Sequence, residues 1–171
     1  MNYSYPRKKP SPAPKIIVTP EYLAKGSLKK SYINTRLAFN VPWMGVVAMA
    51  FAKYPFFYKS LWNYMQPLTK SIEFDNLCKR LVIISKKKAL ELKPKPLIKN
   101  LKKIGYNNYE IKKIDEVNQI FTTGNMPYLI MATIARIFLE EGELLNTKSF
   151  KKNNRSRIKP DKNYLLLIEQ H

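Results

Sequence analysis

The strongest constraint on the fold is an uncharged segment, VPWMGVVAMAFAKYP at residues 41–55, in which no charge occurs before Lys53. Lysine-rich segments flank it on both sides. A helix that is apolar on all sides has no face to offer water and must be buried on all sides. We therefore predict that a buried helix, opened by Pro42 and ending near Tyr54, lies at the centre of the fold. The uncharged stretch is too short to span a bilayer.

The rest of the chain is also patterned for helices. Apolar residues recur three or four positions apart along most of the chain, and no segment alternates with period two. These patterns predict an all-α fold, a compact bundle of about seven helices. Prolines, asparagines and glycines mark where helices begin and end. The start signals are Pro20, Pro42, Pro55, Asn108 and, before Pro127, Asn125; the stop signals are Gly26, Pro67, Gly105, Gly124 and Gly142, and residues 92–96 form a linker.

The ends of the chain differ in composition from its middle. Residues 1–15 are basic and rich in proline, so we expect them to be disordered. Residues 16–142 form the helical domain. Residues 143–171 make a basic tail that we expect to be partly mobile. The N-terminus lacks the apolar core of a signal peptide, which favours a cytoplasmic protein.

The scarcity of cysteine and histidine excludes several kinds of chemistry. Cys78 is the only cysteine and His171, the last residue, the only histidine. An internal disulfide, a thiolate metal site and a zinc site of the usual ligands cannot form within one chain. A catalytic triad is not expected with an imidazole at the terminus. We expect no metal and no cofactor, and any catalysis must use carboxylates, lysines, tyrosines or bound water.

The net charge of +19 has three explanations. It could bind nucleic acid, attract small anionic substrates, or reflect a composition with 25 lysines and 6 arginines. No helix-turn-helix, RRM or KH signature is present, so we predict no specific recognition of nucleic acid. Nonspecific binding to nucleic acid or anionic surfaces stays open.

Several motifs together resemble the group I 2-haloacid dehalogenases, the all-helical DehI-type halocarboxylic acid dehalogenases. The similarity runs over residues 17–142. It rests on PEYLAKGSLKKSYINTR, VPW, the AxxxYPFFYKSLW segment, Glu73 and Arg80 on the long helix, and NMPYLIMATI. The resemblance implies one repeat of a two-repeat helical fold, similar to the first repeat, with the site formed between repeats. A homodimer could rebuild that arrangement.

The family's activity is hydrolysis of the carbon–halogen bond of 2-haloacids by water that an aspartate activates. The resemblance places Val47 where the second repeat has this aspartate, so no catalytic residue is assigned here. It implies that Trp43, Met44 and Val47 form an apolar substrate-binding wall for a small anionic substrate. The alternatives are a non-catalytic helical interaction or dimerisation module and a basic nonspecific binder.

Simple structural roles compete with several of these assignments. A tryptophan after a proline in an apolar helix is more often plain core, so Trp43 could serve packing alone. Glu73 and Asp75 stand in the first turn of a helix, where a carboxylate complements the helix dipole. Glu73 could also pair with Arg80. The pattern thus leaves open whether any acidic residue serves chemistry.

Overall fold

The computed structural model describes residues 15–142, and the described part contains six α-helices, one short 3-10 helix and no strand. The expected all-α fold with about seven helices is confirmed. The expectations for the first 14 residues and for the tail at 143–171 lie outside the described residues. The elements in chain order are η1 (Glu21–Leu23), α1 (Gly26–Phe39), α2 (Val46–Ala52), α3 (Pro55–Leu68), α4 (Ile72–Glu91), α5 (Leu97–Lys103) and α6 (Asn108–Glu141).

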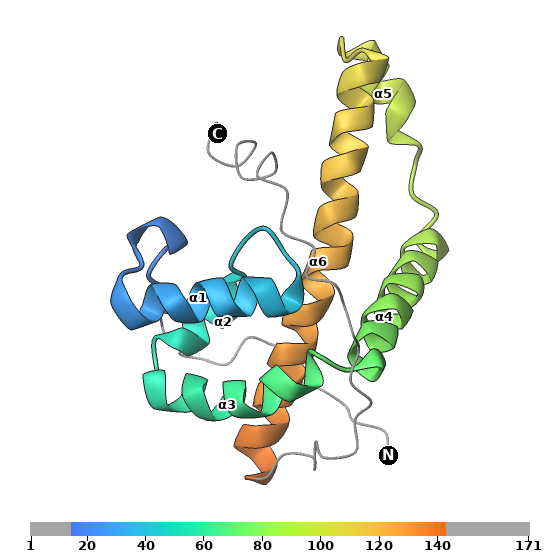
Figure 1. Ribbon diagram of the computed structural model, residues 1–171. Helices are drawn as coiled ribbons and strands as arrows, with labels where there is room; N and C mark the ends of the chain where they lie inside the picture. The colour runs from blue at the N-terminus through green and yellow to red at the C-terminus, as the bar shows by residue number, and fades with distance from the viewer. Residues whose placement is uncertain (1–14, 143–171) are drawn as a thin grey trace.

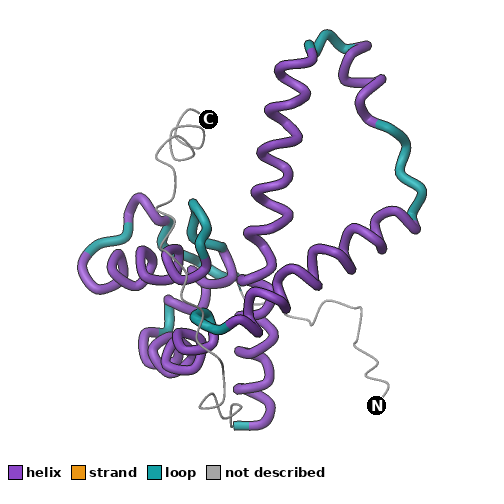
Figure 2. Tube along the Cα trace, turned by 45° about the vertical axis from the view of Figure 1, so that its right-hand side comes forward, coloured by secondary structure: helices purple, strands orange, loops and turns teal. Residues whose placement is uncertain are grey.

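The helix α6 is the axis of the molecule (Figure 1). It contacts α2, α3, α4 and α5. Helices α1, α2 and α3 pack around its C-terminal half, while α4 leaves this body and α5 leads back to the N-terminal end of α6 (Figures 1 and 2). The result is a body with a hairpin of helices that projects from it. Among the described residues, no helix is both long enough and apolar enough to cross a membrane.

One predicted boundary is wrong, because α6 continues through Gly124, Asn125 and Pro127 without a break. The expected N-cap at Asn125 does not exist. The helix begins instead at Asn107, whose side chain accepts the Glu110 N–H while the Glu110 carboxylate accepts the Asn107 N–H, a complete capping box. Gly124 and Pro127 are both buried against the body, and this packing outweighs their local tendency to end a helix.

The prediction that the 41–55 segment is a helix buried on all sides is also wrong. Helix α2 covers only Val46–Ala52. Its buried residues are Ala48 and Ala52, while Val46 is 66% exposed and Val47 is 40% exposed. Small alanines face α3 and α6, and the two valines at the start of the helix face water. The apolar segment is therefore buried on one side only.

The apolar residues on the first part of α6 are not buried either. Ile114, Val117 and Phe121 are exposed along the projecting part of the helix. The core lies in the body instead. Its most deeply buried side chains come from α1, α3, α4 and the second half of α6, and include Tyr32, Phe39, Leu61, Met65, Phe74 and Met131.

Two glycines let the segment before α2 pack directly on α6. A Cβ at position 124 would lie 2.4 Å from Cη2 of Trp43, and a Cβ at position 45 would lie 2.7 Å from Cδ1 of Tyr128. The Tyr128 hydroxyl donates to the Trp43 carbonyl at 2.6 Å. Each aromatic ring therefore lies on a glycine of the other segment.

We expect Gly124→Ala to lower the free energy of unfolding by about 1–3 kcal/mol, because the new methyl group overlaps the Trp43 ring. Alanine is the better helix former, so the loss would run against helix propensity. Urea unfolding followed by circular dichroism measures it. Asn125→Ala, at the exposed neighbouring position, is the control and should be nearly neutral. A Gly124→Ala change that stabilises the protein would contradict the packing; in a Trp43→Leu background the penalty should largely disappear.

Tyr58 is a buried phenol with a defined partner. Thr35 donates its hydroxyl to the Ser31 carbonyl at 2.8 Å, so Tyr58 donates to Thr35 Oγ1. Burial raises the pKa of Tyr58 from 10.0 to about 12. The folded protein thus holds this proton more tightly than the unfolded chain. The stability that this contributes is complete below pH 10 and is lost as the pH rises from about 10 to 12.

We therefore expect the stability advantage of the native protein over Tyr58→Phe to shrink between pH 9 and pH 11.5. At pH 9 the variant should be less stable by about 1–2 kcal/mol, since it removes a buried hydrogen bond. Urea midpoints of both proteins across this pH range provide the measurement. Tyr22→Phe, which removes an exposed phenol, is the matched control. A gap between native and Tyr58→Phe that stays constant with pH would be the contrary result.

Candidate functional site

The Val41–Gly45 segment that precedes α2 is held in place by an ion pair. The Arg36 guanidinium contacts Glu21 Oε1 at 2.8 Å and donates to the Pro42 carbonyl at 3.1 Å. The other carboxylate oxygen of Glu21, Oε2, accepts the Met44 N–H at 3.0 Å. Asn40, in the left-handed conformation with φ of 54°, ends α1 and turns the chain into this segment. One carboxylate thus ties η1, α1 and the VPW motif together.

Trp43 is half-buried and lies on α6. Its ring packs over Gly124 and against Phe121, with ring centroids 4.7 Å apart and planes inclined by 44°. Its carbonyl accepts the Tyr128 hydroxyl. Of the two roles that the sequence leaves open for Trp43, core packing and substrate binding, these contacts are those of packing. An indole face on the rim of an exposed apolar region can still serve as one wall of a site.

The other two residues of the predicted wall lie apart from Trp43. Met44 is buried in the core, where its side chain cannot reach a ligand from the surface, whereas Val47 lies on the exposed face of α2. Trp43, Met44 and Val47 are therefore close in sequence, but their side chains point in three directions. Trp43 lies on α6, Met44 lies in the core and Val47 faces the solvent. None of them lines either of the two cavities found among the described residues.

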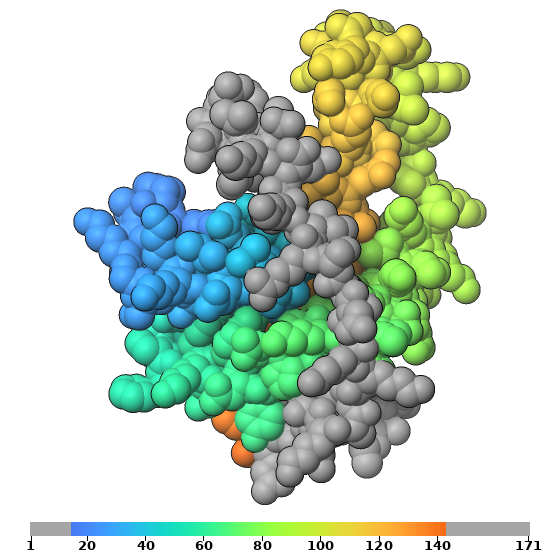
Figure 3. Space-filling view, viewed as in Figure 1, coloured from blue at the N-terminus to red at the C-terminus, as the bar shows by residue number. Residues whose placement is uncertain are grey.

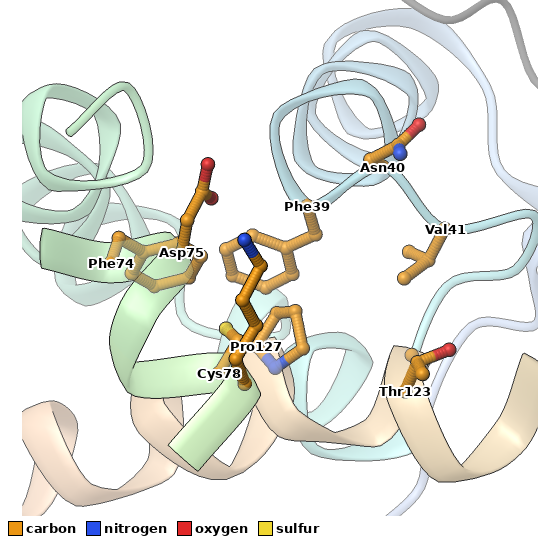
Figure 4. A pocket seen from close by; sticks show the side chains of 10 residues that line it. Phe39, Asn40, Val41, Phe74, Asp75, Cys78, Thr123 and Pro127 are labelled. Carbon is orange, nitrogen blue, oxygen red and sulfur yellow. The ribbon is translucent and has the colours of Figure 1, made fainter. Parts of the chain in front are cut away.

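A cavity of about 200 Å³ opens between the end of α1, the first turns of α4 and the middle of α6. Figure 4 shows Phe39, Phe74 and Pro127 grouped within it, with Asp75 on α4 and Thr123 on α6. Gly124 belongs to the lining of the cavity, and the Trp43 ring also packs on this glycine. Val41 of the VPW motif lines the cavity directly, and Gly124 also joins the cavity to the Trp43 ring.

Asp75 is the only charged side chain that is buried in the described part of the chain. It stands with Glu73 in the first turn of α4, where Ser71 accepts the Phe74 N–H as N-cap. The expected position in a helix first turn is confirmed, but no sequence pattern indicates that one of these two carboxylates borders a cavity. Glu73 is exposed, and the described ion pairs do not include one between Glu73 and Arg80.

The chemistry available around this cavity is restricted. Burial raises the pKa of the Cys78 thiol to about 11, so it is protonated near neutral pH and is a poor nucleophile. No group of three or more histidine, cysteine, aspartate or glutamate side chains in the described range could hold a metal ion. The other ionisable side chains that line this cavity are Asp75 and Lys79, and the Glu21 carboxylate bonds to the neighbouring segment through the Met44 N–H.

Comparison with known proteins gives consistent relatives. The chain is 38% identical over 142 residues to an (R)-2-haloacid dehalogenase of Rhizobium sp. (strain NHG3), covering 81% of this chain and 54% of the relative. It is 32% identical over 136 residues to an (R)-2-haloacid dehalogenase of Pseudomonas putida, covering 77% of this chain and 42% of the relative. No protein-family model matches the sequence.

Solved structures give the same result for the fold. A D-2-haloacid dehalogenase in complex with L-LA superposes with a TM-score of 0.69 and 31% identity, over 79% of this chain and 47% of that protein. A D-2-haloacid dehalogenase mutant superposes with a TM-score of 0.73 and 28% identity, over 89% of this chain and 55% of that protein. Matches to about half of a helical dehalogenase agree with the predicted single repeat. The chain belongs to the 2-haloacid dehalogenase family, and it spans about half the length of the relatives that it matches.

Proposed function

We propose that this chain supplies one half of a 2-haloacid dehalogenase-type site, and that a second helical unit supplies the other half. The observation that carries the proposal is the exposure of Val46 and Val47 at the start of α2. Both side chains belong to the apolar segment that identifies the family, yet the described chain leaves them 66% and 40% exposed. An exposed apolar helix start next to Trp43 is the surface on which a second unit would pack.

The reaction proposed for a completed site is hydrolysis of a 2-haloacid. A carboxylate takes a proton from water, the water oxygen attacks the carbon that carries the halogen, and halide leaves as the carbon–oxygen bond forms. The segment from Trp43 to Val47 offers only apolar contacts to such a substrate. Both oxygens of the nearby Glu21 carboxylate are engaged, one with Arg36 and one with the Met44 N–H. The general base is therefore proposed to come from the second unit.

A second copy of the chain is the simplest partner, since a two-fold axis would bring two equivalent α2 faces together. Both copies would then carry Val47 where the family has its aspartate. We propose that such a homodimer binds small carboxylate anions without hydrolysing haloacids, and that hydrolysis needs a partner unit with the aspartate. The net charge of +19 favours the approach of anions.

A non-catalytic helical interaction module is the second candidate. The absence of any carboxylate from residues 43–47 favours it. In this alternative the α2 face serves assembly alone, and no haloacid binds. The two candidates differ in what a restored carboxylate would do.

We expect no halide release from 2-chloropropionate by the native protein at pH 8–9, and measurable release after Val47→Asp. Val47 is on the surface, so the change should leave the fold intact, and the new carboxylate can act as the base. Ion-selective electrode readings at high protein concentration provide the measurement. Val47→Asn, which has the same shape without the base, is the control and should be inactive. Halide release by the native protein above buffer would contradict the need for a partner unit with the aspartate, and inactivity of Val47→Asp would favour the non-catalytic module.

We also expect the native protein to form dimers at micromolar concentration through the α2 face. Val47→Lys places a cation in that contact and should shift the protein toward monomer by about tenfold or more in dissociation constant. Size-exclusion chromatography with light scattering distinguishes the two states. Leu139→Lys changes an exposed apolar residue near the C-terminal end of α6 and serves as the control. A native monomer, or equal effects of both substitutions, would count against this surface.

A further inference from the structure

The projecting hairpin ends in a tip that is separate from the proposed site. The tip, defined here as residues 90–106, comprises the end of α4, the linker, α5 and the turn into α6. Helix α5 and the turn into α6 form the extremity of the described fold in both ribbon and tube views, while the end of α4 and the linker lie lower on the same side. The tip stands clear of α1, α2 and α3 in the space-filling view (Figures 1, 2 and 3). A flat surface could therefore meet the tip before any other part of the described fold.

The tip exposes aliphatic side chains in unusual density. Leu92 is 83% exposed, Ile104 71% and Leu97 67%, and Leu90 and Ile98 are also exposed. Five leucines and isoleucines lie open within 17 residues. Single exposed apolar residues are ordinary on protein surfaces, but a group of them at one extremity indicates a contact with another apolar phase or partner.

The tip and the helix turns on either side of it are strongly cationic. Residues 86–113 contain ten lysines and two glutamates and no arginine or aspartate, a local net charge of +8. One glutamate, Glu91, pairs with Lys88 at 2.8 Å, and the other, Glu110, caps α6. The lysines therefore dominate the field around the exposed leucines and isoleucines. Long lysine side chains can lay their apolar stems on a boundary while keeping the ammonium in water.

We propose that the hairpin tip binds the surface of an anionic lipid membrane, with its leucines and isoleucines inserted at the headgroup boundary and its lysines on the anionic headgroups. The mixture of exposed aliphatic residues and lysines is the composition of interfacial membrane contacts. A second copy of the chain is a poor partner for the tip, because two positively charged tips would repel each other. A nucleic acid would neutralise the lysines but leave the aliphatic side chains in water, and the region lacks the arginines that bind phosphate in a bidentate manner. The inference does not depend on the proposed dehalogenase-type site.

Vesicle co-sedimentation of the full chain tests the proposal. The vesicles are neutral phosphatidylcholine alone or phosphatidylcholine with about a third phosphatidylglycerol, at 50 and 150 mM NaCl. We expect binding to anionic vesicles at both salt concentrations, weaker at the higher one because salt screens the lysines, and little binding to neutral vesicles. Three proteins are compared with the native one: Leu92→Ser/Ile98→Ser/Ile104→Ser, Lys99→Gln/Lys102→Gln/Lys103→Gln, and the control Leu139→Ser at the other end of α6.

The serine variant and the glutamine variant should each lose at least about tenfold in partition coefficient, through apolar insertion and charge respectively. Leu139→Ser should bind as the native protein does. Because all substituted tip side chains are exposed, circular dichroism should show an unchanged helix content; Leu92→Ser alone, in the linker outside any helix, repeats the test if α5 is perturbed. Native-like binding by the serine variant would overturn the proposal, as would equal binding to neutral vesicles or no binding at 150 mM NaCl. Tighter binding to random duplex DNA than to vesicles, unaffected by the serine changes, would overturn it in favour of nucleic acid.

Discussion

The packing of the Trp43–Gly45 segment on α6 is the contact on which the rest of the structure depends. Two aromatic rings each lie on a glycine of the opposite segment, and the Tyr128 hydroxyl closes the pair through the Trp43 carbonyl. The contact joins parts of the chain 85 positions apart, so it links the first helices to the last. It also explains why a glycine stands inside α6, because a Cβ at position 124 would overlap the Trp43 ring. Pro127, one turn further on, is buried beside the cavity that Phe39 and Phe74 also line.

Glu21 contributes to the same arrangement from the other side. Its carboxylate contacts Arg36 and receives the Met44 N–H. Each of these hydrogen bonds has an ionised partner, and such bonds are roughly twice as strong as those between neutral groups. The VPW motif is thus held between a charged clamp on η1 and α1 and an aromatic contact on α6. A motif held on two sides positions its residues without a long helix of its own, and α2 needs only seven residues.

The sequence predicted the helical class, most helix starts and the family, because these depend on periodicity, caps and an ordered set of motifs. It failed where tertiary contacts override local signals. Gly124 and Pro127 are strong helix breakers taken alone, and only their burial against the body, with Trp43 on Gly124, shows why α6 continues. The apolar run around Val47 was predicted to be buried all round, but residue hydrophobicity does not say whether the covering surface lies in the same chain. The burial of Asp75 beside a cavity was equally invisible, because a first-turn carboxylate usually lies in water.

The length of α6 has a consequence for how the protein opens. Its 34 residues span about 50 Å at the rise of an α-helix, but the body covers only the C-terminal half. The N-terminal half is flanked by α4 and α5, whose own outer residues are exposed. The backbone amides of one continuous helix should therefore exchange with solvent deuterium over a gradient, rapidly near Glu110 and slowly near Met131, so that the hairpin can unfold and reform while the body stays folded.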